Sequence, residues 1–248
     1  MLGTGLNVLT VVVGGLCGSL LGDRLPQKTQ QTIRSGLGLM TLLIGLQMAL
    51  TTHNVLVVLG SVVLGAVIGE WWGVEAALER LGNWLQHRVG AMEQKTAAIN
   101  PERPVRSLAQ GFVMASLVFC VGPMAILGPI QEGLSGDHRL LLIKATLDGF
   151  TALAFGAALG PGVALSALLI LVYQGGFGLA ALGVGHWLGD ITPTHPAVIE
   201  LTATGGVLIM GISLGLLELR AVRVANMLPA VALAPLIVIA LRALGLWS

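Results

Sequence analysis

Long apolar runs alternate along this chain with short polar breaks. Most runs are close to the roughly 17–25 residues that a helix needs to cross the hydrocarbon core of a bilayer. Nearly all charged residues fall in the breaks. The pattern predicts an all-α polytopic membrane protein with about eight transmembrane helices, at residues 5–22, 34–51, 54–73, 107–131, 139–159, 161–189, 198–218 and 224–246.

The composition agrees with this pattern. Hydrophobic residues make up 55% of the 248 residues and charged residues only 10%, whereas a soluble domain carries about 25% charge. The net charge of +1 argues against a nucleic-acid-binding surface. Cys17 and Cys120 lie singly in apolar runs and predict neither a disulfide nor a metal site. We therefore expect residues 1–248 to form a single transmembrane domain, with the lipid bilayer as its main partner and no cofactor.

Positive charge distinguishes the two ends of the predicted spans. Ten of the thirteen Lys and Arg residues lie in one set of alternate loops. The positive-inside rule assigns that set to the cytoplasm and both termini to the outside. The longest of these loops, at about 74–106, has apolar positions at helical spacing between charged ones. We expect it to be a cytoplasmic amphipathic connector lying along the membrane surface.

Two predicted spans resemble each other. Residues 36–50 align without a gap with residues 202–216, which pairs Gly45 with Gly211 and Gln47 with Ser213. Spans one to three would then correspond to spans six to eight. An offset of five spans inverts the orientation, as in the inverted-topology repeats of many secondary transporters. The alternative is that any two helices rich in leucine and glycine align this well, and the sequence leaves both explanations open.

Lys144 and Asp148 carry the most unusual chemistry in the chain. They lie one helical turn apart inside an apolar run, so their side chains share a helix face and can form an ion pair. Charged residues within a membrane are costly, usually face the interior of a helix bundle, and often mark a functional site. Three explanations are open for the pair: a role in transport or gating, a purely structural contact, or a Lys144 that extends to the outer interface.

Other polar and helix-breaking residues extend this candidate site. Two Gly-Pro pairs in span four disfavour a continuous helix, and span six is long enough to be tilted or split. Irregular backbone at membrane depth is tolerated where it is buried or lines a cavity. We predict helix breaks at Gly122, Pro123, Gly128, Pro129, Gly175 and Gly176. The predicted substrate or ion site comprises Asp148, Lys144, Gln174, Gln131, Gln47 and Asn7.

The sequence lacks recognisable catalytic, metal-binding and phosphate-binding motifs, so we expect no enzyme. The leading hypothesis is a secondary transporter or channel-like carrier for a small solute or ion, because broken helices, an inverted repeat and an intramembrane ion pair are typical of such proteins. The alternative is a non-transporting membrane scaffold or assembly partner. A homo-oligomer is compatible with either hypothesis.

Several motifs also resemble those of a known family. They are Gly5-Leu-Asn-Val, Gly36-Leu-Gly-Leu-Met-Thr-Leu-Leu-Ile-Gly-Leu-Gln-Met-Ala, Gly69-Glu-Trp, Phe119-Cys-Val-Gly-Pro-Met-Ala-Ile-Leu-Gly-Pro-Ile-Gln-Glu-Gly, Lys144-Ala-Thr-Leu-Asp-Gly, and the stretch from Thr204-Gly-Gly to Asn226-Met-Leu-Pro. The chain resembles bacterial inner-membrane proteins of domain-of-unknown-function family 554 over essentially its whole length. The resemblance implies a multi-span protein of the bacterial inner membrane and supplies no substrate.

Overall fold

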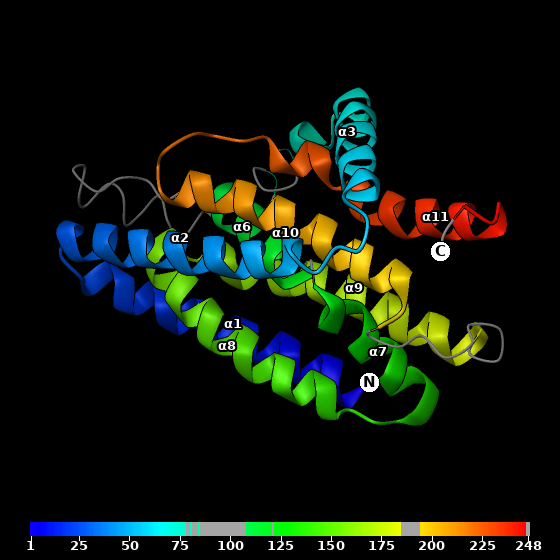
Figure 1. The fold of residues 1–248 in the computed structure, drawn as a ribbon. Helices are drawn as coiled ribbons and strands as arrows, with labels where there is room; N and C mark the ends of the chain where they lie inside the picture. The colour runs from blue at the N-terminus through cyan, green and yellow to red at the C-terminus, as the bar shows by residue number, and fades with distance from the viewer. Residues whose placement is uncertain (78–79, 81–83, 85–107, 121, 185–193, 247–248) are drawn as a thin grey trace.

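The computed structural model describes residues 1–77, 80, 84, 108–120, 122–184 and 194–246 (Figure 1). The described residues form helices and connecting loops, with no strand among them. In chain order the helices are α1 (Leu2–Arg24), α2 (Gln27–Ala49), α3 (Val55–Trp72), α6 (Leu108–Cys120), α7 (Pro123–Ser135), α8 (Arg139–Leu159), α9 (Gly162–Val184), α10 (Pro196–Leu216), the 3₁₀ helix η1 (Val224–Met227) and α11 (Pro229–Ala243).

The helices confirm the all-α polytopic class. Seven helical segments among the described residues are long and apolar enough to cross a membrane. α6 and α7 pass the same test only as a pair, which is bent by 60°, as in a broken span or a re-entrant loop. The bend falls at Gly122, as the sequence predicts. Pro123 begins α7, because proline is well tolerated in the first turn of a helix, where its missing N–H has no intrahelical partner to lose.

The other predicted helix breaks are absent. α9 is one continuous helix from Gly162 to Val184, so the split or break expected at Gly175 and Gly176 was wrong. Glycine lowers helix propensity by about 1 kcal/mol relative to alanine, and a helix of 23 residues tolerates that cost. The helix is packed at Gly178, where a Cβ would come within 3.0 Å of the Met1 side chain.

The second Gly-Pro pair of span four lies inside a helix as well. Gly128 and Pro129 are both within α7, which continues to Ser135, so the break expected there was also wrong. A Cβ on Gly128 would come within 2.7 Å of the Leu141 side chain on α8. The glycine therefore permits close packing of α7 on α8 rather than an unwound segment.

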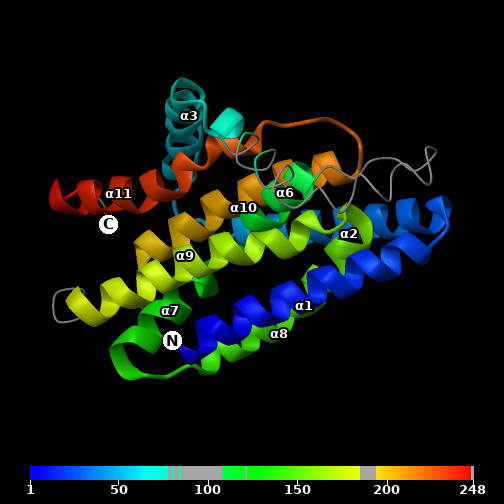
Figure 2. The same cartoon turned by 180° about the vertical axis from the view of Figure 1, so that it is seen from behind.

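The closest helix packing joins α1 and α8, which lie side by side in Figures 1 and 2. Gly14, Gly18 and Gly22 face α8 at successive turns, and a Cβ on any of them would collide with a main-chain oxygen of α8. Small residues at this spacing let two helix backbones approach closely within a membrane. The parallel α1–α8 pair is thereby fixed in register.

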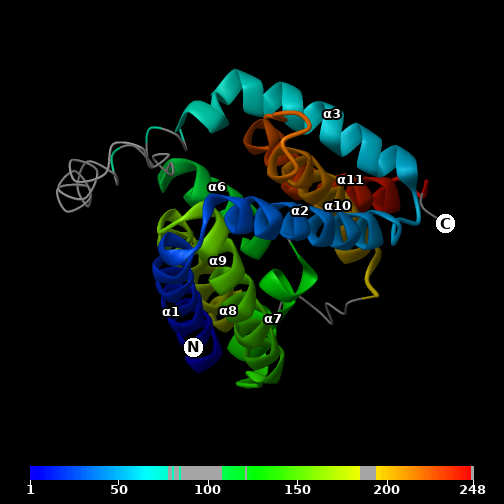
Figure 3. The same cartoon turned by 90° about the vertical axis from the view of Figure 1, so that its left-hand side faces the viewer.

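Three further contacts join helices from the two ends of the chain. α1 packs on α9, α2 on α10, and α3 on α11. Figure 3 shows α2 beside α10 and α3 above α11. Glycines mark these contacts too, since a Cβ on Gly45 would meet Gly206 and Met210, and a Cβ on Gly65 would meet Ala230. Each pair is antiparallel.

The outer surface of these helices is apolar. Leu56, Phe150 and Leu236 are among many large hydrophobic side chains that remain exposed. A soluble monomer rarely exposes apolar patches on this scale, so the surface indicates contact with the lipid bilayer. Of the connector predicted at 74–106, residues 74–77 are helical, and nearly all of the rest lies outside the described residues.

Candidate functional site

Lys144 and Asp148 form a buried ion pair in the first half of α8. The Lys144 Nζ lies 2.6 Å from the Asp148 Oδ2 and also donates to the main-chain oxygen of Phe119 at 3.0 Å. Lys144 is 6% exposed and Asp148 8%. The lysine therefore points into the bundle and does not extend to an interface.

Asn7 on α1 and Gln174 on α9 complete this group. The Asn7 Nδ2 donates to the Asp148 Oδ2 at 3.0 Å and to the Gln174 Oε1 at 3.2 Å. Both amide side chains are fully buried. We call Asn7, Lys144, Asp148, Gln174 and the Phe119 carbonyl the polar cluster. Four of the six predicted site residues thus meet at one point, where α1, α8, α9 and the end of α6 come together.

The local sequence explains why these side chains point inward. Asn7 lies one turn from Val11, and Gln174 one turn from Ile170; both apolar residues belong to the hydrophobic core. Positions four residues apart share a helix face. The faces that bury the core therefore carry the amides into it, and the polar cluster is enclosed by apolar packing.

Several buried polar atoms near this point lack a hydrogen-bond partner among the described residues. They are the Asn7 Oδ1, the Gln174 Nε2 and the Ser116 Oγ; the Thr204 Oγ1 on α10 is a fourth such atom. An unsatisfied buried group costs about 1–3 kcal/mol, and native proteins leave few of them. The polar cluster therefore has unused capacity to bind a polar ligand. The sequence analysis did not identify Ser116 as a site residue, although it directly follows Ala115, which is buried.

Gln47 and Gln131 lie outside the polar cluster. Both residues are exposed, Gln47 on α2 and Gln131 on α7. The buried face of α2 is marked by Thr41 and Gly45, and Gln47 is two residues beyond Gly45, which is nearly the opposite side of a helix. Hydropathy gave the depth of these amides in the membrane and gave no information on the direction in which they face.

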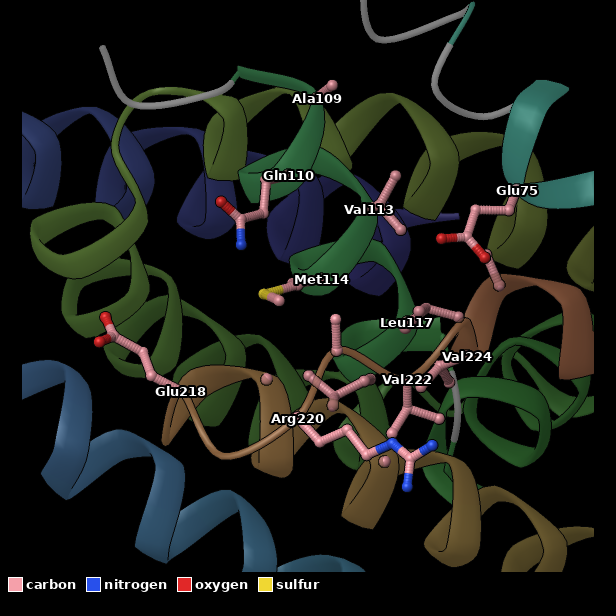
Figure 4. A pocket seen from close by; sticks show the side chains of 15 residues that line it. Glu75, Ala109, Gln110, Val113, Met114, Leu117, Glu218, Arg220, Val222 and Val224 are labelled. Carbon is pink, nitrogen blue, oxygen red and sulfur yellow. The ribbon is translucent and has the colours of Figure 1, made fainter. Parts of the chain in front are cut away.

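A pocket of about 740 Å³ lies between α6, α10 and the connector that follows α10 (Figure 4). Apolar side chains such as Met114, Leu117 and Ile212 line it, together with the charged Glu218 and Arg220. Leu117 directly follows Ser116 and precedes Phe119 by two residues. One helix, α6, therefore contributes to the pocket on one face and to the polar cluster on another.

Two more carboxylates are buried, and both bind main-chain amides at helix starts. Glu132 accepts from the Gly3 N–H at 2.7 Å and lies 3.2 Å from the terminal amine of Met1. Glu200 accepts from the Thr52 hydroxyl at 2.6 Å and from the Asn54 N–H at 2.9 Å. A carboxylate at the N-terminal end of a helix satisfies free N–H groups and complements the helix dipole. These two residues fix the start of α1 and the turn before α3.

Metal-binding side chains are not grouped in the part of the chain that the structure describes. No set of three or more His, Cys, Asp or Glu residues there could hold a metal ion. The polar cluster consists instead of one carboxylate, one ammonium, two amides and one main-chain carbonyl.

Comparison with known proteins gives matches over nearly the whole chain. A family model described as "Protein of unknown function (DUF554)" matches residues 2–239. The chain is 30% identical over 239 residues to "Uncharacterized protein YqgA" of Escherichia coli (strain K12), covering 94% of each chain. It is 26% identical over 251 residues to "Uncharacterized membrane protein YdfK" of Bacillus subtilis (strain 168), covering 99% of each. No solved structure matches the chain.

Proposed function

Because the chain belongs to the DUF554 family and is similar to a protein named as a membrane protein, we propose a function that uses its membrane-embedded site. The protein is a secondary transporter or channel-like carrier that moves a small solute or ion across the bacterial inner membrane. The observation that carries this proposal is the polar cluster. The proposal includes no enzymatic activity.

The polar cluster supports a transport function, because burying charged and polar groups costs free energy and a binding role would explain why they are there. Lys144 and Asp148 are buried together in a membrane-spanning helix, and replacing such a pair by apolar residues is often neutral or stabilising. Asn7 and Gln174 add two buried amides, each with an unpaired atom. A carrier needs polar groups inside the membrane that bind its cargo, whereas a scaffold can hold its helices together with small and apolar residues.

The pocket supports access to the polar cluster from one side. It extends from the charged Glu218 and Arg220 to Leu117 on α6. The Ser116 hydroxyl next to Leu117 is buried and unpaired. α6 lies between the pocket and the cluster, since it contributes Leu117 to one and the Phe119 oxygen to the other, and it is a short helix that ends at the 60° bend.

Helix pairing supports the inverted repeat. The alignment that pairs Gly45 with Gly211 also pairs Asn7 with the residue just before Gln174. Asn7 donates a hydrogen bond to Gln174 where α1 meets α9. The same alignment pairs Gly65 with the residue just after Ala230. Gly65 packs against Ala230 itself where α3 meets α11. Contacts centred on equivalent positions are what a two-fold axis between inverted halves would produce.

The ends of α2 and α10 extend this symmetry. The alignment pairs Arg34 with Glu200 and Thr52 with Glu218. Glu200 accepts a hydrogen bond from Thr52 at 2.6 Å, and Arg34 donates to Glu218 at 3.3 Å. The two contacts are therefore equivalents at opposite ends of the helix pair. The Glu200 contact is buried and short, while the Arg34–Glu218 contact is exposed and lies beside the pocket, as expected of a carrier closed at one end and open at the other.

Charge supports the orientation within the proposal. Arg34 and Glu218 connect the first turns of α2 to the end of α10. Arg24 ends α1, Lys28 lies in the first turn of α2, and Arg220 follows α10. The positive-inside rule then gives a cytoplasmic pocket and two outer termini. Substituted cysteines near Met1 and near Arg220, probed with a membrane-impermeant maleimide in intact cells, test this orientation. We expect labelling near Met1 alone; labelling near Arg220 alone would show the opposite orientation.

The test of transport uses purified protein in proteoliposomes. Inwardly directed gradients of Na⁺, K⁺ and a panel of small polar solutes are applied, and solute uptake and internal pH are recorded. We expect the wild type to dissipate at least one gradient and Asp148→Asn to abolish this flux, because the neutral amide cannot balance the Lys144 charge. Gln47→Leu is the matched control, since it removes an exposed amide from α2, outside the polar cluster.

Two results contradict the proposal. Equal flux through the wild type and Asp148→Asn would show that the polar cluster is not part of the transport path. A wild type that moves nothing, while it co-purifies with another membrane protein in stoichiometric amount, favours the scaffold instead. Both variants must remain folded in the membrane, which fluorescence-detected size exclusion checks directly.

A further inference from the structure

The Lys144 ammonium occupies a position that is built for a positive charge. α6 ends at Cys120, so the carbonyls of its last turn have no intrahelical partners and carry partial negative charge. The Phe119 oxygen is one of them and accepts from the Lys144 Nζ at 3.0 Å. The Asp148 carboxylate lies on the other side of the ammonium at 2.6 Å. A helix end and a carboxylate thus converge on one cation.

Two further oxygen atoms belong to side chains near this position and are not bonded to the ammonium. Asn7 donates to the same Asp148 oxygen that Lys144 contacts, so the Asn7 amide lies next to the ammonium. Its Oδ1 is buried without a hydrogen-bond partner among the described residues. The Ser116 Oγ, one turn before Phe119 on α6, is also buried and unpaired. Carboxylate, amide, hydroxyl and main-chain oxygens are the ligands that hard cations prefer.

We propose that the polar cluster binds a monovalent metal cation such as Na⁺, K⁺ or Li⁺, and that Lys144 is a tethered competitor for the same position. This inference rests on the proposed carrier function and names the class of its cargo. Asp148 is the single carboxylate of the cluster and balances one positive charge. A divalent ion would leave excess charge in a buried site, where such charge is costly.

Competition follows from the charges. Two positive charges a few ångströms apart in a medium of low dielectric constant repel strongly, so a metal cation enters only when the ammonium leaves. The lysine side chain is a flexible four-carbon stem and can withdraw. The cluster then holds one positive charge before and after exchange. Cation binding at Asp148 is thereby coupled to the movement of Lys144.

The test measures thermal unfolding of purified protein in detergent, in NaCl, KCl or LiCl against choline chloride at equal ionic strength. A cation that binds the folded state alone raises the Tm. Lys144→Met removes the competitor, and Lys144→Gln is a second neutral variant that retains a polar end. Lys144→Arg retains a permanent charge and is the matched control.

We expect a metal-specific rise in Tm for both neutral variants. The wild type should respond more weakly, with an apparent Kd raised by roughly tenfold or more, because the ammonium fills the site in most molecules. Lys144→Arg should give no response. Adding Asp148→Asn to either neutral variant should remove the response.

Melting that is the same in choline and in all three metal salts, for the wild type and both neutral variants, overturns the proposal. A response that survives the addition of Asp148→Asn overturns it too. If a neutral variant cannot be purified, the wild type at high salt still decides, since its metal-specific rise must vanish in Asp148→Asn. Metal binding without flux in proteoliposomes would refute the carrier alone, and flux of an uncharged solute without metal binding would refute this inference alone.

Discussion

The buried ion pair on α8 gives a prediction whose sign can be worked out from its contacts. Lys144→Met and Asp148→Leu each remove one charge and leave the other inside the bundle. After Lys144→Met, Asp148 keeps only the Asn7 amide as a partner. After Asp148→Leu, the ammonium keeps only the Phe119 oxygen.

The expected magnitudes differ between the single and double variants. Breaking a buried pair from one side costs about 3–5 kcal/mol, because the remaining charge is uncompensated. In Lys144→Met/Asp148→Leu no charge remains, and the main loss is the bond to the Phe119 oxygen, which costs about 1–3 kcal/mol if it stays unsatisfied. The double variant should therefore be more stable than either single variant.

Equilibrium unfolding in mixed detergent micelles, followed by circular dichroism, measures the three free energies of unfolding. Gln47→Leu again serves as the control for a polar-to-apolar change on an exposed helix face. A double variant destabilised by the sum of the two single effects would show that Lys144 and Asp148 do not interact, and single variants as stable as the wild type would show that the cluster is fully hydrated.

Two other contacts give predictions of stability. Gly18→Val should lower the Tm strongly or prevent folding, because its side chain would collide with the Leu153 main-chain oxygen, whereas Gly5→Val, which meets nothing within 4 Å, should leave the Tm nearly unchanged; equal melting would contradict the α1–α8 packing. Glu132→Ala should cost about 2–4 kcal/mol, since it leaves the Gly3 N–H and its neighbours without their charged acceptor, and chemical denaturation measures that loss.

The sequence predicted helix positions well and helix faces poorly. Apolar runs located the seven spanning segments and the bent α6–α7 pair, because membrane depth is encoded in average hydropathy over about 20 residues. Asn7 and Gln47 carry the same signal, an amide within such a run, yet only Asn7 lies in the polar cluster. The difference is rotational. Asn7 is in phase with Gly14 and Gly18 on the buried face of α1, and Gln47 is out of phase with Gly45, so glycine spacing contained information that hydropathy lacked.

Helix breaks were over-predicted for a related reason. A Gly-Pro pair signals a weak helix, and whether the helix breaks depends on what packs against it. The chain bends at Gly122, whereas Gly128 is packed against Leu141 and its helix continues. Gly175 and Gly176 meet nothing within 4 Å and α9 still continues, because glycine without a following proline only lowers helix propensity. Tertiary contacts at these positions come from residues distant in the chain, and local sequence does not contain them.

The composition of the polar cluster follows from its place in the proposed repeat. Asn7 comes from the first half and Gln174 from the second, at nearly equivalent positions, while Lys144 and Asp148 come from the segment between the halves. If the halves exchange their conformations, the amides exchange roles and the charges stay near the axis. A cation held there would face the Arg34–Glu218 end in one state and the Glu200–Thr52 end in the other, with no change in the Asp148 contact. The central segment, which has no repeat partner, is therefore where a carrier of this architecture would place its binding charge.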